Sequence, residues 1–265
     1  NTANKISKAN IAERISLPPH NDEIHALTST INGLLNRLED ALLRERQFTS
    51  DASHELRTPL SIIKGTLEVL IRKPREVIQY EEKIRYCISE TDRMTRLIDQ
   101  LLLLARYDTG KINPVKTEFL FAEKIEMVLQ RLNPLLEDKK ISVNRDIDKN
   151  LILNADPGMT EIILENILTN AIKYSGNESS IDIKAVRNGS GILFSVKDYG
   201  IGMTEQQIKN IFDRFYRADA SRSSEAGGFG LGLAISKKLC DIQDIKINVE
   251  SALDKGTNFK LHIPV

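Results

Sequence analysis

The sequence lacks features that would point to several classes of protein. Its 37 Lys and Arg residues equal its 37 Asp and Glu residues, so the formal net charge is zero. No overall field draws the chain to nucleic acid or to an anionic surface, and we expect no nucleic-acid partner. A run of about 20 apolar residues, the length that spans a bilayer, is also missing. The most apolar stretch is only Leu101–Ala105.

Cysteine is scarce as well. Cys87 and Cys240 are the two cysteines of the chain, and they fall in separate helical patterns without CxxC or metal-ligand spacing. We therefore expect both to be small buried apolar side chains, which suits a reducing compartment. The sequence predicts a cytoplasmic location.

One histidine, His54, has neighbours that are typical of a reactive histidine. His54 lies in FTSDASHELRTPLSII, residues 48–63, with Glu55 next to it and Thr58 four positions on. Residues four apart share a helix face, so the Thr58 hydroxyl lies on the side of the imidazole. An imidazole can have one nitrogen held by a partner, here Glu55, and the other free to attack. A lone histidine on such a helix is more often an ordinary surface or core residue, so the motif needs support from elsewhere.

Four later segments give that support through their order. They are NILTNAIKYS from Asn166, DYGIGM from Asp198, FDRFYRAD from Phe212 and GGFGLGLAI from Gly227. Each is weak evidence alone. Behind the HELRTPL core, they resemble the ordered boxes of the ATP-binding domain of sensor histidine kinases: the asparagine box, the first glycine box, the segment from Phe212 and the second glycine box. The resemblance to these kinases of two-component systems covers nearly the whole chain.

The N-terminal half is predicted to be helical. Apolar residues from Ile24 to Ala41 are spaced alternately three and four apart, as in a coiled coil. We expect one helix from Ile24 through Leu70 and, after RKPRE at residues 72–76, a second from about Glu76 to Arg106. Their apolar stripes are too wide for one hairpin, and a homodimer would bury them in a four-helix bundle. A monomeric hairpin packed on the next domain is the alternative.

The rest of the chain mixes helices and strands. A break at residues 107–114, with Gly and Pro, indicates a hinge. Helices are expected at 120–137, 157–174 and 231–241, and strands at 141–147, 151–154, 181–187, 192–197, 245–251 and 258–263. This order fits the α/β sandwich of the gyrase, Hsp90, kinase and MutL type (Bergerat or GHKL). The fold class is thus multidomain, an all-α dimeric bundle followed by an α/β ATP-binding domain.

The resemblance also implies domain boundaries. We expect a partial HAMP-like linker and coiled-coil helix at 1–44, a dimerisation and phosphotransfer domain at 45–110, and an ATP-binding domain at 111–265. Residues 9–38 resemble the second half of a HAMP linker, with Asp22 and Glu23 before its second helix. HAMP modules usually follow a transmembrane helix. We therefore expect the cytoplasmic part of a membrane-anchored sensor that meets the membrane only through an absent N-terminal segment.

The asparagine box points to magnesium-bound ATP. Asn166 and Asn170 lie on one helix face, so both amides can reach one metal and its phosphates. The resemblance makes Asn170 the Mg²⁺ ligand. ATP-hydrolysing relatives carry a glutamate base where Asn166 stands, and an amide cannot serve as that base, which favours a kinase. Lys173 can reach the phosphates, and Tyr174 can pack near the nucleoside.

The glycine boxes complete the expected nucleotide site. Asp198 follows an apolar strand and can accept the adenine amino group, while Gly200 and Gly202 let the backbone come close to the base. The second box leads into a helix whose first-turn N–H groups can bind phosphate. Phe229 stands in it where the family often has a small residue. The remaining expected contacts are Gly228, Gly230, Leu231 and Gly232 in that box, Arg217 and more weakly Arg214 in a lid at 203–227, and Thr257 near the phosphates.

The expected function follows from the resemblance. His54 would take the γ-phosphoryl group of ATP, and a response regulator would receive it on an aspartate. Thr58 would orient the water that dephosphorylates the regulator. A nucleotide-binding scaffold without turnover is the main alternative, and a gyrase-like ATPase is disfavoured by Asn166.

Overall fold

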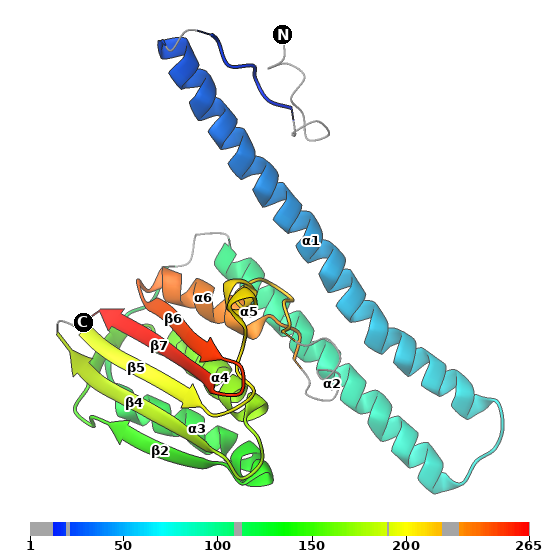
Figure 1. Ribbon diagram of the computed structural model, residues 1–265. Helices are drawn as coiled ribbons and strands as arrows, with labels where there is room; N and C mark the ends of the chain where they lie inside the picture. Colours follow the sequence, from blue (N-terminus) through cyan, green and yellow to red (C-terminus); the bar gives the residue numbers. More distant parts are fainter. Residues whose placement is uncertain (1–12, 20–21, 109–112, 190, 219–227, 265) are drawn as a thin grey trace. The chain divides into compact units, whose positions relative to one another are not determined.

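The structure is a computed structural model that describes residues 13–19, 22–108, 113–189, 191–218 and 228–264 (Figure 1). The chain divides into two compact units, Asn1–Pro74 and Arg75–Val265. No helix in the described part of the chain is long and apolar enough to cross a membrane.

The first unit is built on one long helix. Helix α1 (Glu23–Ile71) begins at Asp22, whose side chain caps it by accepting hydrogen bonds from the backbone N–H groups of Ile24 and His25. It continues through Pro59, as expected from the apolar pattern. Ahead of it, the backbone of Ile15 exchanges two hydrogen bonds with the Asn32 side chain, at 3.0 and 2.9 Å. Parts of the HAMP-like segment, residues 9–12 and 20–21, lie outside the described residues.

Much of the apolar seam of α1 is exposed in the described part of the chain. Several of its members are exposed large hydrophobic side chains: Ile24, Leu27, Leu34, Leu38, Leu60 and Leu67. Helix α2 (Val77–Asp108) opens the second unit and repeats this property at Ile84, Ile88, Ile98 and Leu102. Exposed apolar stripes of this length favour association with another helix.

An α/β sandwich follows α2. Its elements are β1 (Thr117–Leu120), α3 (Phe121–Lys139), β2 (Ser142–Ile147), β3 (Ile152–Ala155), α4 (Pro157–Tyr174), β4 (Ser180–Asn188), β5 (Gly191–Asp198), α5 (Glu205–Asn210), α6 (Gly232–Ile242), β6 (Lys246–Ala252) and β7 (Gly256–Pro264). The main sheet has the order β2-β4-β5-β7-β6; β2 is parallel to β4 and the other pairs are antiparallel. Strands β1 and β3 form a separate antiparallel pair.

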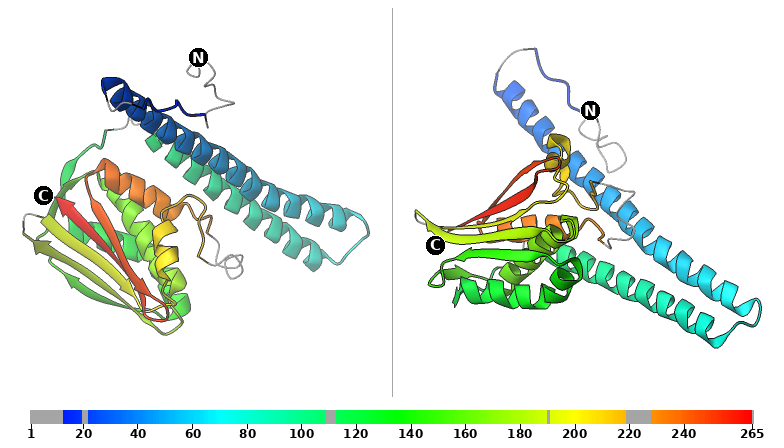
Figure 2. Two further views of the ribbon diagram at one scale, coloured as in Figure 1. Left: turned by 45° about the horizontal axis from the view of Figure 1, so that its top comes forward. Right: turned by 60° about the horizontal axis from the view of Figure 1, so that its bottom comes forward.

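The core lies between one face of the sheet and the helices α3, α4 and α6, which Figure 2 shows on that face. Strand β5 explains the arrangement, because its residues alternate between buried and half-buried positions and so direct Ile192, Phe194 and Val196 inward. The ring of Phe194 meets that of Phe121 edge-on at a centroid distance of 5.4 Å. Buried Ile167 of α4 belongs to the same core.

The expected fold class, long helices followed by an α/β sandwich, is confirmed. Helix α4 has the predicted bounds, and the other predicted elements begin and end within about two residues of their expected positions. Strand β1 and helix α5 were not predicted. The two cysteines are buried as expected, and burial raises the pKa of Cys240 to about 12.

Candidate functional site

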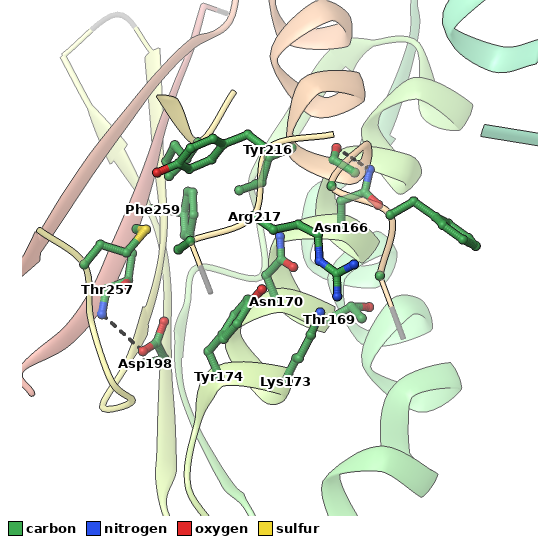
Figure 3. A pocket seen from close by; sticks show the side chains of 18 of the residues that line it. Asn166, Thr169, Asn170, Lys173, Tyr174, Asp198, Tyr216, Arg217, Thr257 and Phe259 are labelled. Carbon is green, nitrogen blue, oxygen red and sulfur yellow. Dashed lines mark hydrogen bonds between the residues drawn. The ribbon is translucent and has the colours of Figure 1, made fainter. Parts of the chain in front are cut away.

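A pocket of about 410 Å³ in the second unit collects most of the residues expected to bind nucleotide (Figure 3). Those lining it are Asn166, Asn170, Lys173, Tyr174, Asp198, Gly202, Arg217, Gly228, Gly230, Gly232 and Thr257. Gly200 and Leu231 do not line it. The pocket thus brings together α4, the end of β5, the start of β7, the segment before residue 219 and the start of α6.

Asp198 closes one end of the pocket. It is 3% exposed, and its Oδ1 accepts hydrogen bonds from the backbone N–H groups of Gly200 at 2.9 Å and Thr257 at 3.1 Å. Burial raises the pKa of Asp198 above its ordinary value, and these two hydrogen bonds oppose the rise. The Thr257 hydroxyl is itself 2.9 Å from Oγ of Ser251. These bonds fix the Asp198 carboxylate before any ligand enters.

Two glycines beside Asp198 are needed for close backbone packing. A Cβ on Gly200 would lie 2.1 Å from the carbonyl oxygen of Tyr174. Gly202 has a φ of +62°, and a Cβ there would lie 1.8 Å from the carbonyl oxygen of Ala252. The structure therefore gives these glycines a packing reason in addition to the expected approach to a base.

The two amides of the asparagine box have different surroundings. Asn166 Nδ2 donates to the carbonyl oxygen of Gly232 at 3.0 Å and to Oγ of Ser236 at 3.1 Å, so it ties α4 to the first turns of α6. The half-buried Asn170 side chain makes no hydrogen bond within the described part of the chain, and Figure 3 shows it facing the pocket. Asn170 is therefore the amide available to a ligand.

Positive charge gathers at the other end of the pocket. Figure 3 places the Arg217 guanidinium beside Lys173 and Thr169. Burial lowers the pKa of Lys173, and the nearby charges of Arg217 and Lys139 lower it further. Arg217 Nε and Nη2 are buried without a hydrogen-bond partner among the described residues. Cations close together without acidic partners form a site suited to an anion.

Lys139 holds the C-terminal end of α4, next to the cationic end of the pocket. Its Nζ donates to the carbonyl oxygens of Ile172, Lys173 and Ser175 at 2.9, 2.7 and 3.0 Å. These carbonyls belong to the end of α4, where a cation also interacts favourably with the helix dipole.

Arg214 does not line the pocket. Its Nη2 lies 2.6 Å from Oδ2 of Asp108, at the end of α2, and Lys238 Nζ lies 3.9 Å from Oδ1 of the same carboxylate. The expected lid at 203–227 contains helix α5, and its residues 219–227 lie outside the described residues.

Other lining residues were not identified from the sequence. Thr169 lies three residues after Asn166 on α4, and Phe259 lies two residues after Thr257 on β7, so spacing could have indicated both. Met203 and Tyr216 belong to the expected lid. Arg96 and Gln100 come from α2. No local pattern links that helix to the pocket.

His54 lies in the first unit, on the exposed surface of α1, with Thr58 also exposed and Glu55 half-buried. Thr58 Oγ1 donates to the carbonyl oxygen of His54 at 3.2 Å, so the hydroxyl is bonded to its own helix. Within the described ranges, no hydrogen bond joins the side chains of His54 and Glu55. The expected pairing therefore requires another rotamer.

Comparison with known proteins identifies the class. Residues 44–110 match the His Kinase A (phospho-acceptor) domain, and residues 155–265 match the histidine kinase-, DNA gyrase B- and HSP90-like ATPase family. The chain belongs to the sensor histidine kinases and carries their phosphoacceptor and ATP-binding domains.

The signal transduction histidine-protein kinase ArlS of Staphylococcus aureus is similar to the chain, with 33% identity over 258 residues, or 97% of this chain and 57% of that protein. The chain thus spans just over half the length of the curated relatives it matches.

Solved structures agree on the fold. The histidine kinase ThkA in complex with the response regulator protein TrrA matches with a TM-score of 0.69 at 23% identity, covering 85% of this chain and 63% of that one. The Acinetobacter baumannii histidine kinase AdeS matches with a TM-score of 0.66 at 20% identity, covering 80% and 97%. At these identities the likeness concerns the fold alone.

Proposed function

We propose that this region autophosphorylates His54 from ATP and passes the phosphoryl group to an aspartate of a response regulator. The observation that carries the proposal is the polarity of the pocket (Figure 3). A buried carboxylate, Asp198, lies at one end, and Lys173 and Arg217 lie at the other. A nucleoside triphosphate has the matching polarity, with a base that donates hydrogen bonds and a chain of phosphates.

Asp198 would recognise the adenine end of ATP. Its Oδ1 is held by two backbone N–H groups, so the carboxylate is oriented and can accept the adenine amino group. Tyr174 and Phe259 line the same pocket and supply aromatic surface for the base and ribose. Thr257, whose N–H holds Asp198, would act mainly through the backbone.

The residues present also fit a Mg²⁺ ion bound with ATP. Asn170 offers a free amide oxygen beside the cationic end of the pocket. No group of three His, Cys, Asp or Glu side chains that could hold a metal occurs within the described residues. Mg²⁺ commonly takes few protein ligands and completes its shell with phosphate and water. When bound, it would neutralise charge on the phosphates during transfer.

The pocket is poorly equipped to hydrolyse ATP. Asn166 cannot accept a proton from water, and its Nδ2 is committed to α6. Glu165 also lines the pocket, but its carboxylate lies 3.3 Å from the Arg131 guanidinium. These features favour transfer of the γ-phosphoryl group to a histidine over a gyrase-like ATPase.

The transfer itself needs a free imidazole nitrogen. His54 Nε2 would attack the γ-phosphorus, the bond from that phosphorus to the β,γ-bridging oxygen would break, and ADP would leave. Glu55 would accept the Nδ1–H and stabilise the positive charge on the ring. The exposure of His54 supports this role, since both ATP and a regulator must reach it. A regulator aspartate would then attack the phosphohistidine and free the imidazole.

Two further roles concern the helices. A homodimer would bury the exposed apolar seams of α1 and α2 in a four-helix bundle.

Thr58 would accept a hydrogen bond from a water that attacks the phosphoaspartate of a docked regulator, so the region would also act as a phosphatase. The HAMP-like N-terminal segment supports a place on the cytoplasmic side of a membrane-anchored sensor.

Labelling with γ-³²P-ATP tests the proposal. We expect label that survives alkali and is lost in acid, as for phosphohistidine, and that moves to a response regulator of the same organism. A chain that binds ATP but takes up no label would instead be a nucleotide-binding scaffold.

A further inference from the structure

Helix α2 contributes to the wall of the nucleotide pocket. Arg96 and Gln100 line it together with residues of the α/β sandwich. Both belong to the region matched by the phosphoacceptor domain rather than the ATPase family. They are four positions apart and so lie on one face of α2, with Arg93 one turn before Arg96.

The face of α2 that carries Arg93, Arg96 and Gln100 also contacts the second glycine box. The Arg93 guanidinium lies 5.3 Å from the centroid of the Phe229 ring, a cation–π contact. Phe229 is 5% exposed and lines the pocket itself. Further along α2, Asp108 meets Arg214 and Lys238. Contacts at these points hold α2 beside the pocket within this unit.

Arg96 and Gln100 present unused polar groups to the pocket. Arg96 forms no hydrogen bond or ion pair among the residues that the structure describes. The Gln100 Nε2 donor also makes no hydrogen bond in the same set, and its Oε1 acceptor is buried without a partner. A guanidinium offers five donors and binds phosphate oxygens well, and a glutamine amide can donate beside it. The pocket therefore gathers three arginine and lysine side chains, Arg96, Lys173 and Arg217.

We propose that Arg96, assisted by Gln100, binds the polyphosphate of the nucleotide, so that α2 completes the ATP site. This inference rests on the proposed ATP-binding function of the pocket. Arg93 acts as a positioning residue, because its contact with Phe229 keeps Arg96 at the pocket. Nucleotide affinity then depends on a helix outside the ATP-binding domain.

Calorimetry on the 265-residue chain with ATP, ADP and adenosine tests the proposal. Arg96→Ala should weaken ATP binding about tenfold, as expected for loss of a charge-assisted hydrogen bond. ADP should lose less, and adenosine should bind as before. Arg96→Lys should recover part of the loss, and Gln100→Ala should lose less than Arg96→Ala.

Arg85→Ala is the matched control, since Arg85 is an exposed arginine of α2 that does not line the pocket. It should bind all three ligands as the parent does. If Arg96→Ala binds ATP as tightly as the parent, or weakens adenosine equally, the proposal is wrong. If the parent chain itself fails to bind ATP, the proposed function is wrong, whatever the role of Arg96.

A double-mutant cycle tests the positioning role of Arg93. If Arg93 acts by placing Arg96, the loss caused by Arg96→Ala should shrink in an Arg93→Ala background, because Arg96 is already displaced. Strictly additive losses in ATP affinity would refute this role. Adenosine affinity should stay constant across all four proteins.

Discussion

The helix that carries His54 and the pocket that carries Asp198 differ in how completely one chain assembles them. His54 and Thr58 are exposed on α1, and the described residues place no hydrogen bond between the imidazole and Glu55. Asp198 is 3% exposed and held by two backbone N–H groups, beside glycines that admit no side chain. The pocket around Asp198 is therefore preorganised. The proposed phosphoacceptor, His54, depends instead on molecules that bind to the exposed surface of α1.

The difference has consequences for mutation. Changes near Asp198 should affect binding and folding together, because its neighbours are packed against backbone atoms. Changes at His54 should remove chemistry and leave both folding and nucleotide binding intact. The following predictions test this separation, beginning with the largest expected effect.

Replacing His54 with Gln should abolish alkali-stable labelling from γ-³²P-ATP. The acceptor nitrogen is lost, while the pocket lies in the other unit, so ATP affinity measured by calorimetry should stay nearly unchanged. Label that persists in this variant would make another histidine, His20, His25 or His262, the acceptor. His25 Nδ1 already lies 3.0 Å from the carbonyl oxygen of Pro18, and His20 lies outside the described residues.

Gly202→Ala should destabilise the second unit by about 3 kcal/mol, because the new Cβ meets the Ala252 carbonyl and the backbone has positive φ. ATP binding should weaken as well. Gly176→Ala is the matched control, since a Cβ there meets no atom within 4 Å; its free energy of unfolding should change by less than about 0.5 kcal/mol. Equal denaturant midpoints for both variants would contradict the packing argument.

Asp198→Asn should mainly weaken adenine recognition. Loss of a charged acceptor costs on the order of 1–3 kcal/mol, so the preference for ATP over GTP should fall. Calorimetry with both nucleotides measures it. If the variant keeps the parent's preference, Asp198 does not read the base.

Asn170→Asp should instead alter the Mg²⁺ dependence of ATP binding and of labelling.

The affinity for adenosine should also depend on pH through Asp198. Because burial raises the pKa of this carboxyl group in the free protein, it becomes protonated at a higher pH than an ordinary aspartate. Affinity should therefore be full above the raised pKa and decline as the pH falls through it. The Asp198→Asn protein should lack this decline, and an identical profile in both would assign the titration to another group.

The sequence revealed the parts of this molecule that depend on local pattern. The bounds of α4 and the common face of Asn166 and Asn170 followed from helix signals and periodicity. Strand β1 was missed because its four residues are mostly exposed and do not alternate. Strand β3 is equally short, but its residues alternate between exposed and buried positions, and it was predicted.

The missed contacts join distant parts of the sequence. Asn166 bonds to Gly232 and Ser236, and Arg96 reaches the pocket from α2. The sequence indicates Arg214 as a weaker phosphate contact, but Arg214 pairs with Asp108, more than a hundred residues away. Such partners are set by tertiary packing, which residue spacing along one element does not encode.

Thr58→Ala should have the smallest effect on autophosphorylation, within a few-fold of the parent. The hydroxyl donates to the His54 carbonyl, which leaves its oxygen lone pairs free to orient a water on a docked phospho-regulator. Dephosphorylation of the regulator should therefore slow strongly in Thr58→Ala and persist in Thr58→Ser. Helix stability should change little, because alanine's higher helix propensity offsets the lost side-chain bond. Glu55→Ala should show the reverse pattern and impair phosphorylation of His54 most. Equal losses of both activities in Thr58→Ala would mean that the hydroxyl only braces its own helix, and the phosphatase role would then be withdrawn.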